Sequence, residues 1–370
     1  MIRSITLLLL SSLALLSGAQ GAESTGRFTG AQSCSTSGCY GGGEGHNQFH
    51  QWYKKDVHTR AHAILASGRS AGIGEKLGIK DAPKSARCTV CHSPLQSVSA
   101  DLYVDDVKRE AGVACETCHG PAERWLRSHT RPDYTHEMRL AAGMRDLGDD
   151  YARANVCIAC HQNIEQPLLD AGHPPMVFEL DAQLALEPPH WKDEGTWRGP
   201  RSWLTGQAVA LREISWGLTK KPGDAELQPR WQALVWFLRK TDSGSKALPD
   251  GGAAGEMQSA SDRLARNAAK ETWDKSSTLA LLQKVAGLSG EFRDAKGDAV
   301  ASSRRGEIVA QAVDRLWAAL KTEGKLTSET IDTSLAALGP LARAQGGFDN
   351  VKFAAALQQV EVGIELIGKP

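Results

Sequence analysis

Three short stretches of the chain repeat one pattern: two cysteines separated by two residues, with a histidine directly after the second. The three copies are Cys88-Thr-Val-Cys91-His92, Cys115-Glu-Thr-Cys118-His119 and Cys157-Ile-Ala-Cys160-His161. Two thiols at this spacing lie on one turn, where they can add to the two vinyl groups of a haem while the histidine binds the iron. A zinc ribbon or a redox-active dithiol also uses paired cysteines, but neither predicts the histidine. The pattern therefore predicts a covalently bound haem c at each copy.

A fourth cysteine pair, Cys34-Ser-Thr-Ser-Gly-Cys39, precedes the three motifs and differs from them. Four residues separate its thiols, and Tyr40 stands where the histidine would be. Two interpretations remain open, which are a fourth haem c attached through the wider spacing and a disulfide between Cys34 and Cys39. We favour the haem because the pair occurs where the series predicts one, and because none of the eight cysteines is then left over.

Tyr40 is the predicted iron ligand of this fourth haem, since the attachment geometry presents its side chain to the metal. A phenolate ligand favours ferric iron, and an absent sixth ligand would leave an open coordination position. The glycine-rich loop at 41–45 would then admit a small molecule to that position. In the alternative interpretation Tyr40 points away, and His46 or His50 binds the iron instead.

Eight histidines remain once the three motif histidines are set aside, and they are candidates for the sixth ligands of the haems. They are His46, His50, His58, His62, His129, His136, His173 and His190. His58 and His62 stand four residues apart on a predicted helix at 52–65, so they share one face. A zinc pair is the alternative, but the glutamate of a zinc peptidase is missing, because Thr59 follows His58. We favour His58 as a haem ligand, with His62 bound to a propionate or exposed.

Three strings around these motifs are distinctive: Trp52-Tyr-Lys-Lys-Asp-Val-His58-Thr-Arg-Ala61, Gly112-Val-Ala-Cys115-Glu-Thr-Cys118-His119-Gly120-Pro121 and Cys157-Ile-Ala-Cys160-His161-Gln-Asn. His129 lies ten residues after His119. With these pieces, the chain from about Cys34 to His190 resembles the cytochrome c-554 family of tetrahaem electron carriers. The resemblance implies a mostly helical fold with closely packed haem pairs.

Further ligand assignments come from the same resemblance. It implies that His58 and His129 are sixth ligands of haems whose proximal ligands lie elsewhere, and that the haem at His92 is five-coordinate. His173 and His190 are similar to ligands of other multihaem relatives; the alternative is a surface histidine beside a turn-forming proline. The sequence departs from the family at Cys34–Tyr40, which leaves a simple relay function open to question.

The second half of the chain contains no cysteine and no histidine after His190, and its apolar residues recur at helical spacing. A further helix is predicted from Ile331, Leu335 and Leu338 to a stop at Gly339-Pro340, and a last one over 351–366. Three stripes predict the other helices: Trp203, Leu204, Ala208, Leu211 and Ile214; Trp231, Leu234 and Leu238; Val309, Val313, Leu316 and Leu320.

These patterns predict a mainly α protein. We expect a tetrahaem cytochrome domain at 22–195, with little regular structure beyond helices, and a C-terminal helical bundle at 196–370. Residues 241–256 are rich in Gly, Ser and Ala and are typical of a linker. Because the bundle offers no ligand or nucleophile, we expect it to serve structure or partner docking.

Residues 1–21 have the features of a signal peptide, with Arg3, an apolar run at 5–16 and small residues at 19–21. An uncleaved membrane anchor is the alternative, but the run is too short to span a bilayer. We therefore expect a periplasmic or secreted protein with no span after cleavage. The 43 basic and 43 acidic residues give no positive excess, which argues against nucleic-acid binding.

Three functions fit these features. Electron transfer through packed haems, between periplasmic donor and acceptor proteins, needs only the haems and their histidine ligands. An oxidoreductase acting on a small nitrogen, oxygen or sulfur species would use an open, tyrosine-ligated haem at Tyr40 as its catalytic centre. An electron-transfer subunit of a larger redox complex would dock through the C-terminal helices.

Overall fold

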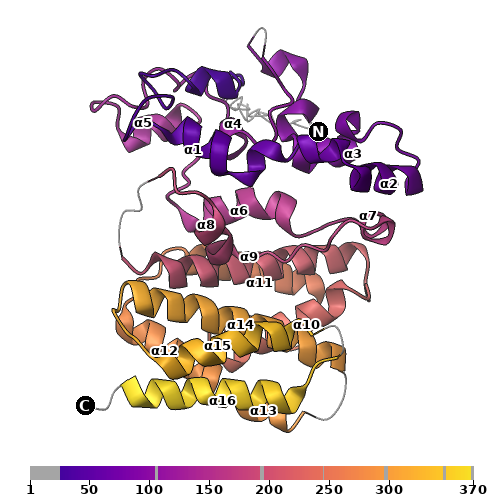
Figure 1. Cartoon of the computed structure of the whole chain (residues 1–370), viewed down its shortest axis with the longest axis vertical. Coiled ribbons are helices and arrows are strands. Elements are labelled where there is room, and N and C mark those ends of the chain that lie inside the picture. Colours follow the sequence, from indigo (N-terminus) through magenta and orange to yellow (C-terminus); the bar gives the residue numbers. More distant parts are fainter. Residues whose placement is uncertain are drawn as a thin grey trace, which may run out of the picture.

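The computed structural model describes residues 26–104, 107–191, 196–244, 246–295, 299–344 and 347–367. The expected signal peptide lies outside these ranges. Over them the chain is helical, and its β structure is a single bridge between Phe28 and Tyr103. The predicted mainly α fold is confirmed. Figure 1 shows short helices from the first half of the chain above a stack of long helices from the second half.

The first half is built from short elements. Its α-helices are α1 (Gln48–Lys55), α2 (Gly68–Lys76), α3 (Ala86–His92), α4 (Cys115–His119), α5 (His136–Ala141), α6 (Asp150–His161), α7 (Gln166–Ala171) and α8 (Leu180–Leu186). Single 3₁₀ turns lie at Ala31–Cys34, Val57–Arg60, Ala63–Ala66, Ala82–Lys84, Pro94–Ser97 and Ala100–Leu102. Every C-x-x-C-H motif forms the last turn of a helix, because α3, α4 and α6 all end at the motif histidine.

The predicted helix at 52–65 is wrong. Helix α1 ends at Lys55, and Asp56 is extended with φ −78° and ψ 129°. The carboxylate of Asp56 accepts a hydrogen bond from the backbone N of His58, at 2.9 Å, and so caps a separate 3₁₀ turn. A short capped turn replaces the continuous helix, and His58 and His62 therefore do not share a helical face.

The second half consists of long helices. They are α9 (Arg198–Lys220), α10 (Leu227–Lys240), α11 (Ala254–Ala268), α12 (Lys275–Ala286), α13 (Ser289–Arg293), α14 (Ala299–Thr322), α15 (Glu329–Ala342) and α16 (Asn350–Ile367). The three predicted stripes fall on α9, α10 and α14, and their residues are buried, except for the partly buried Trp231. Burial of one apolar face per helix is what holds such a bundle together.

One predicted helix end is corrected. Helix α15 does not stop at Gly339-Pro340 but continues to Ala342 with Pro340 inside it. Proline lacks the N–H that would bond the carbonyl four residues back, and one lost bond near a helix end is tolerated. The backbone N of Arg343 bonds the carbonyls of Gly339 and Pro340 and closes the helix.

The main apolar core joins the two halves. It contains the bundle residues and also Ala154 and Ile158 of α6 and Leu180 of α8. Gly206 of α9 lies so close to Leu180 that an added Cβ would be 2.8 Å from the Leu180 Cβ. Leu248, inside the expected linker, is buried as well. The helices α6 and α8 are therefore packed directly on α9, as Figure 1 also shows.

A buried carboxylate strengthens this junction. The side chain of Asp150, in α6, is fully buried and accepts hydrogen bonds from Arg198 and Arg201 of α9, at 2.8–3.2 Å.

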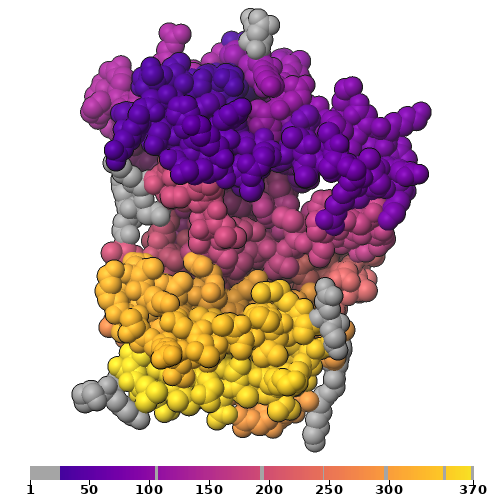
Figure 2. Space-filling model, viewed as in Figure 1, coloured from indigo at the N-terminus to yellow at the C-terminus, as the bar shows by residue number. Residues whose placement is uncertain are grey.

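Within the described ranges, no helix combines the length and apolar character needed to cross a bilayer. Figure 2 shows a hollow between the lobe of the first half, which carries α2 and α3, and the segment beneath it.

Candidate functional site

Each motif histidine faces a second histidine from a distant part of the chain. The ring centres of His58 and His161 are 6.0 Å apart, with an angle of 78° between the ring planes. His92 faces His173 at 6.3 Å and 78°. His119 faces His190 at 6.5 Å and 77°. Three different segments thus produce one repeated geometry.

This geometry fits two imidazoles on opposite sides of one metal. An imidazole nitrogen lies about 2.0 Å from a metal, and the ring centre about 1.1 Å behind it, so two opposed rings are roughly 6.2 Å apart. The three observed separations, 6.0–6.5 Å, match this value. The pairs therefore fit the haem c that the motifs predict.

Hydrogen bonds behind the rings fix their orientation. The Nδ1 of His92 donates to the Ala61 carbonyl at 2.8 Å, and that of His173 to the Pro174 carbonyl at 2.8 Å. The Nδ1 of His190 donates to the Pro188 carbonyl at 3.3 Å. A proton held at Nδ1 leaves Nε2 unprotonated, which is the form that binds a metal.

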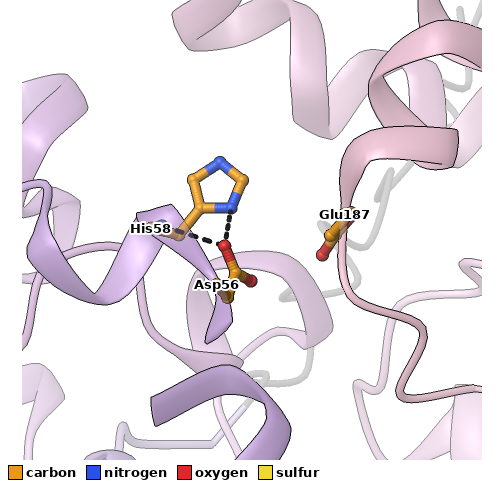
Figure 3. A group of neighbouring side chains, drawn as sticks. All are labelled: Asp56, His58 and Glu187. Atoms are coloured by element: carbon orange, nitrogen blue, oxygen red, sulfur yellow. Dashed lines mark hydrogen bonds and ion pairs between the residues drawn. The ribbon is translucent and has the colours of Figure 1, made fainter. Parts of the chain in front are cut away.

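In the His58–His161 pair, side chains rather than backbone carbonyls lie next to the Nδ1 atoms. The Nδ1 of His58 lies 3.0 Å from the buried carboxylate of Asp56 (Figure 3). The Nδ1 of His161 lies 3.3 Å from the side-chain amide of Gln183 in α8. The Gln183 Oε1 has no partner within the described structure. Exchanging the amide O and N places Oε1 as the acceptor of the His161 proton, so both rings again present Nε2.

Burial favours the neutral form of the three motif histidines. Burial lowers the pKa of His119 to about 4, and the neighbouring His190 adds to the effect. Burial also lowers the pKa of His92 and of His161. His58 is the exception, because its hydrogen bond to Asp56 raises its pKa. A metal ligand must be the neutral imidazole, so low pKa values favour metal binding.

Tyr40 meets His129, but the contact is a hydrogen bond. The Tyr40 Oη lies 2.7 Å from the Nε2 of His129, whose Nδ1 donates to the carbonyls of Trp125 and Leu126. Burial raises the pKa of Tyr40 to about 12, so the phenol keeps its proton and donates it to His129. Two ligand atoms on opposite sides of one metal would be about 4 Å apart.

The open position at Tyr40 stays a prediction, and in this structure the phenol oxygen faces His129. His129, which is only 5% exposed, covers the phenol oxygen. His46 and His50, the alternative ligands for this site, bond the backbone carbonyls of Cys39 and Gly41 instead. Cys34 and Cys39 are free cysteines in this structure, as are the other six, so all eight are available for haem attachment.

Two more histidines lie apart from the ligand pairs. The Nε2 of His62 bonds the Pro83 carbonyl at 3.1 Å, and that of His136 lies 3.2 Å from Asp146. The resemblance implies a five-coordinate haem at His92, whereas in this structure His173 stands opposite His92, where a sixth ligand would lie. His173 reaches that position after the left-handed Gly172 (φ 108°) ends α7.

The segment before the second motif positions His58. Gly112 has φ +73°, and a Cβ there would lie 2.5 Å from the His58 carbonyl oxygen. The backbone N of Val113 then donates to that same carbonyl at 3.0 Å. Only glycine allows this approach without strain. The Gly112-Val113 string therefore fixes a distant histidine beside the motif of Cys115.

Glu116, inside the Cys115–His119 motif, has a structural role. It is 1% exposed, and its carboxylate accepts backbone hydrogen bonds at 2.7–3.1 Å from residues 29, 30 and 122. Burial raises the pKa of Glu116, although these hydrogen bonds oppose the effect. The contacts hold the segment before Cys34 against the helix of Cys115.

The thiols form a series through the molecule. Cys34 and Cys115 interact directly, as do Cys91 and Cys160, and Cys118 lies near Cys157. Neighbouring thiols belong to neighbouring attachment motifs. The motifs therefore follow one another in space in the order Cys34–Tyr40, Cys115–His119, Cys157–His161 and Cys88–His92.

A cavity runs beside three of these motifs. Its volume is about 200 Å³, and Tyr40, His58, His119, His129 and His190 line it. Much of the remaining lining is apolar, including Phe49, Trp52 and Val113. Among the described residues, the Nε1 of Trp125, in the same wall, is buried without a hydrogen-bond partner. Such walls fit a flat apolar group with a polar edge, as a haem is.

Comparisons with known proteins agree with this geometry. Residues 39–120 match the family model described as cytochrome c554 and c-prime. The cytochrome c-554 of Nitrosomonas europaea is 25% identical over 214 residues, which cover 52% of this chain and 88% of that protein. The chain is thus similar to the cytochrome c-554 family. No solved structure matches it.

The likeness supports covalently bound haem c and electron transfer by a c-type cytochrome. It does not extend to the number of haems or to their ligands. The match to the family model ends at residue 120, so for Cys157, His173 and His190 the assignment rests mainly on the motif and the geometry of this chain.

Sequence reasoning missed the side chains that lie next to the Nδ1 atoms of the ligand histidines. Asp56 stands two residues before His58, and an aspartate there can cap the following turn, which is a usable signal. Gln183 and Glu187 belong to α8 and its end, and no local pattern marks them. They approach His161 and His58 only because α8 packs on α9.

Proposed function

We propose that this chain is a tetrahaem c-type cytochrome that carries electrons between redox proteins in the periplasm. Three haems are held by the histidine pairs His58–His161, His92–His173 and His119–His190. The fourth is attached at Cys34 and Cys39, next to Tyr40 and His129. The observation that carries the proposal is the ring separation of 6.0–6.5 Å, repeated at all three C-x-x-C-H motifs.

The protein's own groups hold, orient and shield the cofactors. When bound, each haem supplies an iron that accepts and releases one electron. Carbonyls and side chains at Nδ1 hold the histidine rings, and burial lowers the pKa of His119 and of His161. Apolar walls that include Trp52 and Trp125 restrict water near the irons. At the three histidine pairs, two strong ligands would leave the iron no vacant position for a substrate, which favours electron transfer over catalysis at these haems.

The contacts between thiols support a single row of haems. In this proposal the row begins at the Cys34 motif and ends at the Cys88 motif, with the motifs of Cys115 and Cys157 between them. An electron entering at one end can then leave at the other. Redox partners would bind near the two ends of the row.

Haem content and spin state test this proposal. The purified exported protein should contain four haems per chain, with three low-spin ferric signals from the histidine pairs. Replacing Cys34 and Cys39 by serine should reduce the content to three. A wild-type content of three would contradict the fourth haem and favour the disulfide interpretation.

The ligand at Tyr40 is tested separately. Because its phenol is hydrogen-bonded to His129, we expect Tyr40→Phe to retain all four haems and to change the spectroscopic signal of the haem next to Tyr40. A high-spin ferric signal that disappears in Tyr40→Phe would show an open tyrosine-ligated iron. That result would replace electron transfer alone by an oxidoreductase function at this haem.

A further inference from the structure

One of the three histidine pairs has a carboxylate directly behind a ligand. The Nδ1 of His58 lies 3.0 Å from Asp56, which is 2% exposed. In the other assigned pairs of the described structure, the recorded Nδ1 partners of His92, His173 and His190 are neutral carbonyl oxygens. The charge behind the ligand therefore distinguishes this site.

A second carboxylate reinforces the first. Ligand atoms of Asp56, His58 and Glu187 all lie within 4.8 Å of one another. Figure 3 shows Glu187 approaching from a separate segment, at the end of α8, while Asp56 and His58 share one turn. Helix α8 also provides Gln183 behind His161, the other ligand of the same pair. This helix therefore carries polar groups toward both ligands.

The neighbouring pair has charges of both signs around it. Arg145 and Arg153 lie near His119, whereas Asp56 and Glu187 lie near its partner His190 as well as near His58. Arg153 also lies near Glu187 and offsets part of its charge. Asp56 is bound directly to the ligand, so its charge dominates at His58.

A carboxylate behind a histidine ligand has a known physical effect. It accepts the Nδ1 proton, which makes the imidazole a stronger electron donor to the metal. Its negative charge also stabilises the ferric form, which carries one more positive charge than the ferrous form. Both effects lower the reduction potential.

We propose that Asp56, supported by Glu187, gives the haem between His58 and His161 the lowest reduction potential of the three histidine–histidine haems. The inference rests on the haem assignments of the proposed function. This haem stands inside the row, between the motifs of Cys115 and Cys88, so it forms an energetic step that every transferred electron crosses. Asp56 and Gln183 act as positioning residues, through the ligands His58 and His161.

The test is a potentiometric titration of the intact holoprotein, monitored through the low-spin haem signals. Asp56→Asn retains the side-chain oxygen that accepts from His58 and removes the charge. The lowest of the three low-spin reduction steps should shift to a more positive potential, while the other two remain in place. Glu187→Gln should shift the same step in the same direction, by less. If neither variant moves the lowest step while haem content is full, the inference is overturned.

Two further variants give the control and the site assignment. Asp81→Asn removes an exposed carboxylate that pairs with Lys84, and it should move no step. Gln183→Leu removes the bond behind His161, so it should move the same step as Asp56→Asn and also to a more positive potential. A shift of a different step would overturn the assignment to this pair. Missing haem in the wild-type protein would contradict the proposed function itself, so the two failures are distinguishable.

Discussion

The two halves of the molecule are stabilised in different ways. Before α9 the longest helix is α6, with 12 residues, whereas α9 and α14 have 23 and 24. The first half has its own apolar cluster of only five buried residues: Ala31, Trp52, Leu95, Tyr103 and Ala114. The bundle shares one extensive core. The bundle can therefore fold on its own side chains, while the first half surrounds a cavity that its cofactors must fill.

Removal of the haems should separate the two halves most strongly. A chain produced in the cytoplasm without its first 21 residues receives no covalent haem. We expect helices α9–α16 to remain protected from hydrogen exchange, with residues 26–146 exchanging freely, because little apolar surface is buried there without haem. The holoprotein is the reference. Equal protection in both halves of the haem-free chain would contradict this difference.

A cavity in the bundle core should have the next largest effect. Leu211 is fully buried in α9, and Leu211→Ala should reduce the free energy of unfolding by about 3 kcal/mol. Haem content should be unchanged, because the bundle contains no ligand. Denaturant unfolding followed by circular dichroism measures the effect. The matched control is Leu366→Ala, at a side chain that is 53% exposed, which should change stability little.

The junction between the halves depends on Asp150. Its removal in Asp150→Ala leaves Arg198 and Arg201 without their buried partner, which should cost about 2–3 kcal/mol. The cost is below that of a fully buried pair because the two arginine side chains are 14% and 28% exposed. Asp314→Ala, at an exposed carboxylate, is the control. Equal free energies of unfolding for the two variants would show that the buried Asp150 contact does not stabilise the protein.

A second junction contact should depend on pH. Burial would raise the pKa of Asp262, but hydrogen bonds from Tyr151, Arg212 and Arg266 outweigh burial and lower it to about 2. An unfolded aspartate has a pKa of about 3.9, so the folded protein holds this proton more weakly. The contribution, about 2 kcal/mol, is complete above pH 4 and is lost as the pH falls from roughly 4 to 2.

Comparison with Asp262→Asn measures this contribution. The variant should be less stable than the wild type at pH 7, and the difference should shrink as the pH approaches 2. Urea unfolding at several pH values records both curves. A difference that stays constant across this range would refute the role of the Asp262 charge.

An exposed ion pair should matter least. Lys240 and Glu291 in the bundle are 2.7 Å apart, with side chains 46% and 39% exposed. Lys240→Ala should change the free energy of unfolding by less than about 1 kcal/mol, because water screens the pair. A larger loss by denaturant unfolding would show that surface charges also hold the bundle.

The sequence by itself determined the local features of this protein. The attachment motifs were readable because two thiols and a histidine must lie within five residues, as in Cys88–His92. The bundle helices were readable because burial of one face imposes a period of 3.6 residues, as in α9 and α14. The break at Asp56 was missed because a side-chain cap competed with helix periodicity.

Only the tertiary structure decided which groups meet. His58 and His161, His92 and His173, and His119 and His190 are separated by 71 to 103 residues in the chain. Their residue types show that they can bind a metal, but the pairing depends on how α6, α8 and the intervening loops pack on α9. The contact of Asp56 with Glu187, and of Tyr40 with His129, arose in the same way. Local chemistry fixes what a residue can bind, and long-range packing selects its partner.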